Sequence, residues 1–120
     1  MNIFRLFRHP DNLQDLTPDE LQARLSSHPL IIDVRTPREF RSGHIEDALS
    51  VPLGHESAML NRWPLDAEVV LICKTGHRSQ AAAATLLSNG FQRVFHLKGG
   101  MDAWRRAGKP MAYSSGRTDD

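Results

Sequence analysis

Apolar runs alternate along the chain with segments typical of helices. The runs at 30–34 and 69–72 are continuous and rich in β-branched residues, which is typical of strands covered on both faces. A third strand is predicted at 93–97, and helices are predicted at 18–27, 37–41, 79–89 and 101–107, with a further helix leading from 54 toward 63. This order predicts an α/β fold, in which right-handed crossovers join a parallel sheet to helices on both faces.

Capping residues support two of these helices. Thr17 precedes Pro18, and acidic residues follow in the first turn, a combination that starts a helix. Gly90 follows the alanine-rich segment at 79–89, and glycine readily adopts the left-handed conformation that ends many helices. The sequence therefore predicts boundaries for these helices as well as their pattern.

Composition indicates one ordinary globular domain. A chain of 120 residues folds around a single core, since two domains would each be too small. The 15 Lys and Arg against 14 Asp and Glu leave a net charge of +1, a field too weak for a protein that binds nucleic acid as a polyanion. With 40% apolar residues, a packed core is expected rather than a disordered chain.

The two ends of the chain are predicted to lie outside the domain. We expect an N-terminal extension at 1–11, the domain at 12–112 and a flexible tail at 113–120, because the end segments lack periodicity. The N-terminal segment lacks the apolar stretch and cleavage site of a secretory signal. The longest apolar run, at 69–73, is far shorter than the roughly 20 residues that span a membrane. We therefore expect a cytoplasmic protein with no membrane partner, a compartment that suits a single free cysteine.

The chemistry of the chain concentrates in the loop that follows the second predicted strand. Cys73 stands at the carboxyl end of this strand, where ligands bind in open α/β sheets. The thiolate is the nucleophilic form of cysteine, and helix N-termini and nearby cations lower the pKa of a thiol. The loop supplies cations at Lys74, His77 and Arg78. Its glycine, Gly76, lets several amides point inward.

A purely structural interpretation stands beside this one. A lone cysteine is usually a small buried hydrophobe. Lys74 and Arg78 could form a solvated loop surface, and His77 could face the solvent. The polar, cationic loop with a central glycine favours a nucleophile over a core residue that merely ends a strand.

Three separated motifs stand out in the sequence. The first is the loop Cys-Lys-Thr-Gly-His-Arg-Ser at 73–79. The second consists of Ile-Ile-Asp-Val-Arg at 31–35, Glu-Phe at 39–40, Gly-His-Ile-Glu-Asp-Ala at 43–48 and Val-Pro at 51–52, and the third of Gly-Gly-Met-Asp-Ala-Trp at 99–104 and Gly-Lys-Pro at 108–110. In this order, the motifs resemble the active-site loop, the first signature and the C-terminal signature of the rhodanese, or sulfurtransferase, family.

The resemblance implies a fold and an activity. The fold would be a single rhodanese-like domain with a central, mainly parallel, five-stranded sheet and helices on both faces. Cys73 would take a sulfane sulfur from a donor such as thiosulfate and pass it, as a persulfide, to cyanide or a thiol. The persulfide would lie in a cradle of backbone amides from Lys74, Thr75, Gly76, His77 and Arg78.

The resemblance also implies roles for side chains around the loop. Lys74 and Arg78 are candidates to hold the sulfonate end of thiosulfate, and Ser79 would cap the following helix and donate to the sulfur. Asp33 and Arg35 are expected to form an ion pair that supports the loops rather than to take part in the chemistry. No general base is required, because the pre-ionised thiolate already carries the negative charge.

Partners are expected and cofactors are not. The six histidines show no paired-ligand spacing, so no metal is expected, and no glycine-rich nucleotide motif indicates a cofactor. The expected partners are a small anionic sulfur donor and a thiol acceptor such as thioredoxin, glutathione or a sulfur-trafficking protein. An external acceptor is needed because the chain has no second cysteine to unload Cys73.

Two alternative functions stay open from the sequence. Phosphatases and arsenate reductases of the same fold also pair a loop cysteine with a later arginine, but five residues separate theirs. Four residues separate Cys73 from Arg78, and the shorter loop fits one sulfur atom better than a phosphoryl group. The other alternative is a sulfur carrier or protein-binding module without turnover.

Overall fold

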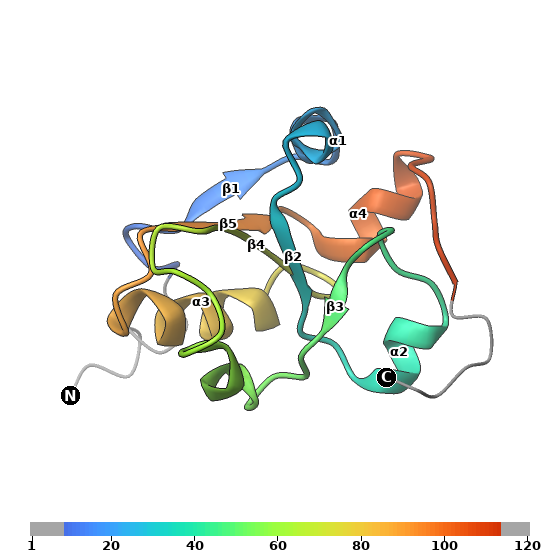
Figure 1. Ribbon diagram of the computed structural model, residues 1–120. Coiled ribbons are helices and arrows are strands. Elements are labelled where there is room, and N and C mark those ends of the chain that lie inside the picture. Colours follow the sequence, from blue (N-terminus) through green and yellow to red (C-terminus); the bar gives the residue numbers. More distant parts are fainter. Residues whose placement is uncertain (1–8, 114–120) are drawn as a thin grey trace.

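The fold is built on one sheet of parallel strands. The computed structural model describes residues 9–113. Its strands are β1 (Gln14–Leu16), β2 (Leu30–Asp33), β3 (Leu49–Ser50), β4 (Glu68–Ile72) and β5 (Arg93–Leu97). They lie in the order β1-β5-β4-β2-β3, and each neighbouring pair is parallel (Figure 1). Strand β4 is therefore central, with a partner on each side.

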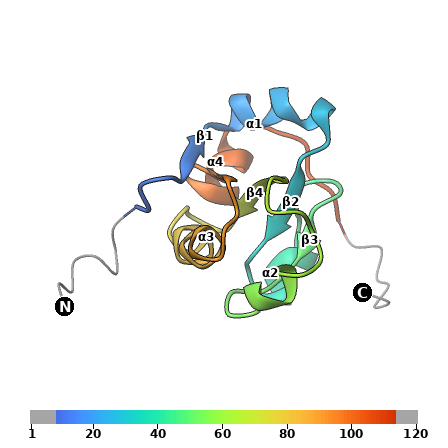
Figure 2. The same cartoon turned by 60° about the vertical axis from the view of Figure 1, so that its left-hand side comes forward.

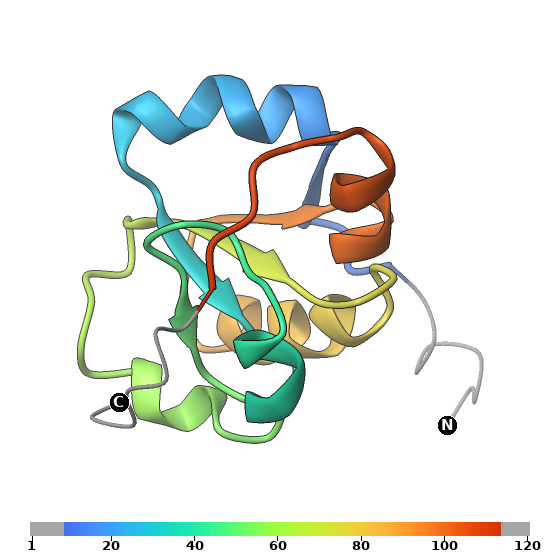
Figure 3. The ribbon, with the colours of Figure 1, turned by 90° about the vertical axis from the view of Figure 1, so that its right-hand side faces the viewer.

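Helices cover both faces of this sheet. The α-helices are α1 (Pro18–Arg24), α2 (Pro37–Arg41), α3 (Arg78–Ser88) and α4 (Gly100–Arg106), and the 3₁₀ helices are η2 (Leu25–Ser27) and η3 (Glu56–Met59). Figure 2 and Figure 3 show α1 and α4 on one side of the sheet and α3 on the other. Since the strands are parallel, their carboxyl ends meet at one edge, and the loops that follow β2 and β4 lie together there.

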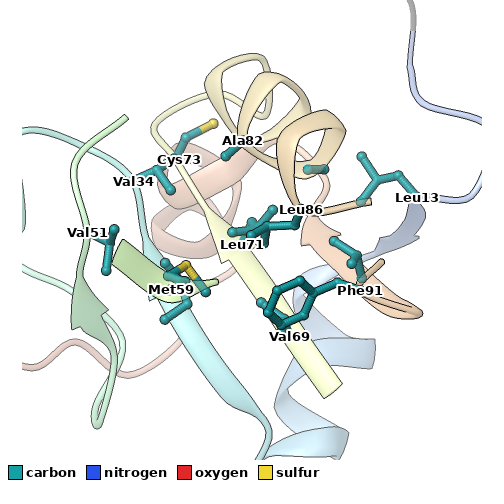
Figure 4. Close-up of a cluster of buried hydrophobic side chains, with 13 residues drawn as sticks. Leu13, Val34, Val51, Met59, Val69, Leu71, Cys73, Ala82, Leu86 and Phe91 are labelled. Atoms are coloured by element: carbon teal, nitrogen blue, oxygen red, sulfur yellow. The ribbon is translucent and has the colours of Figure 1, made fainter. Parts of the chain in front are cut away.

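The central strand sends successive side chains to opposite faces. Val69, Leu71 and Cys73 belong to one cluster of buried side chains, to which α3 contributes (Figure 4). Val70 and Ile72 belong to the cluster on the other face, to which α1 and α4 contribute. This alternation places the sulfur of Cys73 on the α3 face, at the carboxyl end of the strand.

The predicted fold class is confirmed, and most of the predicted elements are present. The strand predicted at 93–97 has the same bounds in the structure, and the helix predicted at 79–89 is shifted by one residue. The helix predicted at 18–27 is an α-helix to Arg24 that continues as a 3₁₀ turn. The sequence pattern did not predict β1 and β3, which have only 3 and 2 residues.

The helix predicted from 54 toward 63 is wrong. The structure has only a four-residue 3₁₀ helix in this segment, at Glu56–Met59. The amides of Ala58, Leu60 and Arg62 bond to the carbonyl three positions earlier rather than four. Pro64 also disfavours a helical conformation of the residue before it, so an α-helix does not become established.

The predicted chain ends lie mostly outside the described residues. This applies to 1–8 of the predicted extension and to 114–120 of the predicted tail. The described part of the extension contacts the domain, because Nε2 of His9 lies 2.6 Å from Oδ1 of Asp15. Within residues 9–113, every helix falls short of the length and apolarity that crossing a membrane requires.

Candidate active site

The sulfur of Cys73 lies buried at the carboxyl end of β4. Its side chain is fully buried, as that of an ordinary core cysteine would be. Its hydrogen bonds distinguish it, because the amide of Gly76 donates to Sγ over 2.9 Å and Sγ lies 3.5 Å from Oγ of Ser79. Gly76 has a φ of +97°, a conformation that favours glycine, so the loop can fold its amide back onto the sulfur.

The start of α4 holds the first residues of the loop. The amide of Met101 donates to the carbonyl of Cys73 over 2.8 Å, and the amide of Asp102 donates to the carbonyl of Lys74 over 3.0 Å. Gly100 makes this approach feasible, because a Cβ there would lie 2.5 Å from the Cys73 carbonyl oxygen. The glycine pair of the C-terminal signature is therefore a docking point for the cysteine loop.

Arg78 is held by a carboxylate from the other side of the loop. Its guanidinium donates to both oxygens of Glu39, over 2.8 and 2.9 Å. Thr36 and Glu39 form the capping box that starts α2, and this fixes where the carboxylate lies. The Arg78 guanidinium lowers the pKa of Glu39 to about 2, and Glu39 in turn raises the pKa of Arg78 above its usual range.

The Glu39–Arg78 pair predicts that a variant without the Glu39 carboxylate is less stable than the natural chain, by an amount that depends on pH. The pKa of Glu39 is 4.5 in an ordinary environment and about 2 in the folded chain, so the pair stabilises the fold above pH 4.5 and is lost as the pH falls toward 2. The Glu39→Gln variant should be less stable than the natural chain by about 1 kcal/mol at pH 6, since the pair is partly exposed, and the difference should shrink by pH 3. Urea unfolding at the two pH values measures it. An equal loss for the exposed Glu46→Gln variant, or a difference that does not depend on pH, would contradict the prediction.

Lys74 is also paired, but at the surface. Its ammonium group lies 3.0 Å from a carboxylate oxygen of Asp102, and its side chain is 55% exposed. Beside it is a pocket of about 290 Å³ whose lining includes Lys74, Asp102, Glu39, Arg35 and Arg105. The pocket therefore offers both cationic and anionic groups next to the cysteine loop.

Asp33 and Arg35 form the expected ion pair, and Arg35 also lines this pocket. Their side chains are 0% and 3% exposed, and the guanidinium donates to both carboxylate oxygens. The same guanidinium donates to the carbonyl of Gly43 over 2.8 Å. The pair thus connects the end of β2 to the segment after α2, a geometry that fits support for the loops.

Ser79 does not cap α3, contrary to the expectation from the resemblance. The residue at the N-cap is His77, no side chain caps this helix, and Ser79 is its second residue. The buried hydroxyl of Ser79 instead lies 3.3 Å from the Gly76 carbonyl oxygen and 2.8 Å from Nδ1 of His96. Burial lowers the pKa of His96, although Asp15 opposes this shift.

Thr75 and His77 of the loop are exposed and contact each other, with 3.0 Å between Oγ1 and Nδ1. Of the side chains predicted to form the site, Ser79 is the one that the structure places in contact with the sulfur. The contribution of Thr75 and His77 through their amides stays a prediction.

The arrangement of sheet, cysteine loop and docking helix matches a known family. The family model described as "Rhodanese-like domain" matches residues 17–107. The chain belongs to this family. The match includes all of the loop at 73–79, all of the first signature and the part of the C-terminal signature at 99–104, so the resemblance seen in the three motifs is confirmed.

Two relatives of this rhodanese-like domain are named as sulfurtransferases. The chain is 36% identical over 106 residues to a protein named sulfurtransferase from Allochromatium vinosum. This match covers 87% of the chain and 99% of the relative. The chain is 30% identical over 109 residues to the thiosulfate sulfurtransferase GlpE of Pseudomonas aeruginosa, covering 91% of the chain and 98% of the relative.

A solved structure similar to this rhodanese-like domain carries a different description. It comes from Rhodopseudomonas palustris and is described as a protein of unknown function and a possible tyrosine phosphatase. The likeness has a TM-score of 0.74 and 32% identity, and it covers 83% of this chain and 85% of the other.

Proposed function

We propose that the protein is a sulfurtransferase in which Cys73 carries a sulfane sulfur as a persulfide. The observation that carries this proposal is the hydrogen bond from the Gly76 amide to Sγ of Cys73, at 2.9 Å. A backbone donor aimed at the sulfur stabilises a negative charge there without reorganisation. The names of the relatives from Allochromatium vinosum and Pseudomonas aeruginosa support the same activity.

The proposed reaction has two steps and needs no cofactor. In the first, the Cys73 thiolate attacks the outer sulfur of thiosulfate, the S–S bond of thiosulfate breaks, and sulfite leaves with its electron pair. In the second, cyanide or a thiolate attacks the outer sulfur of the persulfide, and the Cys73 thiolate leaves. Each step moves one sulfur atom between two anionic groups, so the reaction follows ping-pong kinetics.

The acceptor side of the proposal follows from the cysteine count. The chain has one cysteine, so the persulfide has no internal thiol to resolve it, and an external thiol must accept the sulfur. The pocket beside the loop has Arg35, Arg105 and Lys74 together with carboxylates, and mixed charges of this kind suit a small zwitterionic thiol such as glutathione. In a reducing compartment, a protein such as thioredoxin or a sulfur-trafficking protein presents the same type of acceptor, a free thiol.

Two assays test the proposal against the phosphatase alternative. Purified protein is given thiosulfate and cyanide, and separately p-nitrophenyl phosphate, and the products thiocyanate and nitrophenolate are measured. We expect thiocyanate and no nitrophenolate, because four residues separate Cys73 from Arg78 and the small loop fits one sulfur atom. Nitrophenolate without thiocyanate would instead favour the activity suggested for the Rhodopseudomonas palustris protein.

Loading by itself tests the alternative of a binding module. After incubation with thiosulfate, mass spectrometry of the intact chain should show the mass gain of one sulfur atom, and cyanide should remove it. A chain that takes no sulfur from thiosulfate or from a persulfide donor would overturn the proposed carrier as well as the enzyme.

Lys74 is predicted to contribute to the affinity for thiosulfate. Replacing it with methionine removes a cation beside the loop, so KM for thiosulfate should rise by about three- to ten-fold. The Arg93→Met variant is a matched control, because the Arg93 side chain is 56% exposed, pairs with Glu68, and stands at the opposite end of the parallel strands. Steady-state kinetics of both variants measure the difference, and equal KM values for the two would contradict the role of Lys74.

A further inference from the structure

Three potential metal ligands meet at the Nε2 side of the His96 ring, whose Nδ1 contacts Ser79. Oδ1 of Asp15 lies 2.6 Å from Nε2 of His9 and 2.7 Å from Nε2 of His96, and one ligand atom from each residue lies within 4.8 Å of the others. Asp15 on β1 and His96 on β5 are direct partners in the sheet. We call this group the His9–Asp15–His96 cluster.

The hydrogen bond that His9 makes through Nδ1 leaves its Nε2 atom available to bind a cation. Nδ1 of His9 lies 2.8 Å from the carbonyl oxygen of Pro10, which can only accept, so Nδ1 carries the hydrogen. In the neutral ring, Nε2 then presents a lone pair toward the carboxylate of Asp15. Two acceptors 2.6 Å apart repel each other unless a proton or a metal ion lies between them.

His96 can likewise offer the lone pair of Nε2 to a metal ion while Nδ1 carries the hydrogen. Its Nδ1 lies 2.8 Å from Oγ of Ser79, which can accept a hydrogen bond and leave Nε2 free as a ligand. A histidine held through Nδ1 by an oxygen, with Nε2 free, is the usual arrangement of a metal ligand. Both histidines of the cluster therefore have the supporting contact that ligation needs.

We propose that His9, Asp15 and His96 bind one divalent transition-metal ion of the zinc type. Two imidazole nitrogens and one carboxylate oxygen are a ligand set that suits Zn²⁺, and the fourth position would be taken by water. The composition and spacing of the sequence predict no such site, because the three residues come together only in the folded chain.

The cluster can open to the size that an ion requires. Tetrahedral ligands at about 2.0–2.1 Å from zinc are about 3.3 Å apart, so each short contact must lengthen by roughly 0.6–0.7 Å. Asp15 and His9 have side chains 42% and 39% exposed and can make this movement, whereas His96 is 3% exposed and fixed. The buried imidazole thus serves as the anchor of the site.

The site also connects to the sulfur, a consequence that rests on the proposed function. With a metal ion on Nε2, His96 keeps its hydrogen on Nδ1 and donates it to Oγ of Ser79. The hydroxyl of Ser79 must then donate elsewhere, and its neighbours are the Gly76 carbonyl at 3.3 Å and Sγ of Cys73 at 3.5 Å. The bound ion therefore fixes the orientation of a hydroxyl that lies beside Cys73.

Zinc binding is tested by calorimetry in a Cys73→Ser background, which removes the one thiol that could bind the ion by itself. We expect one Zn²⁺ per chain, and at least about a tenfold loss of affinity in each of the variants His9→Ala and Asp15→Asn. Both side chains are partly exposed, so these variants should fold. The variant His55→Ala, at an exposed histidine far along the chain from the cluster, should bind like the background protein.

Imidazole ¹⁵N NMR gives a second measurement, because zinc should shift the Nε2 resonances of His9 and His96 and leave those of His55 in place. Absence of zinc binding, or binding that survives both His9→Ala and Asp15→Asn, would overturn the site. Since binding is measured without Cys73, a failure of the proposed sulfur transfer would not change this result. A failure to bind zinc would likewise leave the sulfur transfer standing.

Discussion

Replacing Cys73 with serine should abolish thiocyanate formation while leaving the fold intact. We expect the rate to fall by roughly three orders of magnitude or more, to the background of thiosulfate with cyanide alone, because a hydroxyl is not ionised at neutral pH and forms no persulfide. The chain has no other cysteine, so no second thiol can take over. The assay is thiocyanate production, and mass spectrometry of the variant after thiosulfate treatment should show no added sulfur.

The fold of this variant is controlled separately. Serine is close in size to cysteine, and its oxygen can accept the hydrogen bond that the Gly76 amide gives to the sulfur. The melting temperature of Cys73→Ser should therefore stay within a few degrees of that of the natural chain. Sulfur transfer retained by the folded variant would show that Cys73 is not the nucleophile.

The sequence predicted those features that depend on residues close together in the chain. The strand, the cysteine and the helix after it are adjacent, so the position of Cys73 at the carboxyl end of β4 could be predicted from the pattern. The ion pair of Asp33 and Arg35 also joins residues two positions apart at the end of one strand, and it was expected from the resemblance to the family.

Contacts between distant segments could not be predicted in this way. Glu39 holds Arg78 from 39 residues away, and Asp15 reaches His96 across 81 residues. In the sequence, Glu39 belongs to a capping box and Asp15 to a polar stretch, and neither pattern says which cation or imidazole it meets. Strand β3 has two residues and is defined by its pairing with β2, so it has no periodicity of its own.

Gly100 is where such a distant contact controls the site, and the Gly100→Ala variant should lose both stability and activity. The added Cβ would lie 2.5 Å from the carbonyl oxygen of Cys73 and also against that of Lys74. Both carbonyls accept the hydrogen bonds that dock α4 on the loop, so neither can move away without breaking one. We expect a loss of about 3 kcal/mol in the free energy of unfolding. We also expect thiocyanate formation about 100-fold slower in the protein that remains folded, because the loop is displaced.

The Gly108→Ala variant separates this clash from backbone strain. Gly108 has a φ of +70°, close to the +63° of Gly100, but nothing lies within 4 Å of a Cβ added there. It should therefore cost only about 1 kcal/mol, the strain of an alanine in the left-handed region, and leave the rate of sulfur transfer unchanged. Urea unfolding and thiocyanate kinetics of both variants give the comparison. If the two alanines had the same effect on activity, the docking of α4 on the loop would not be what positions Cys73.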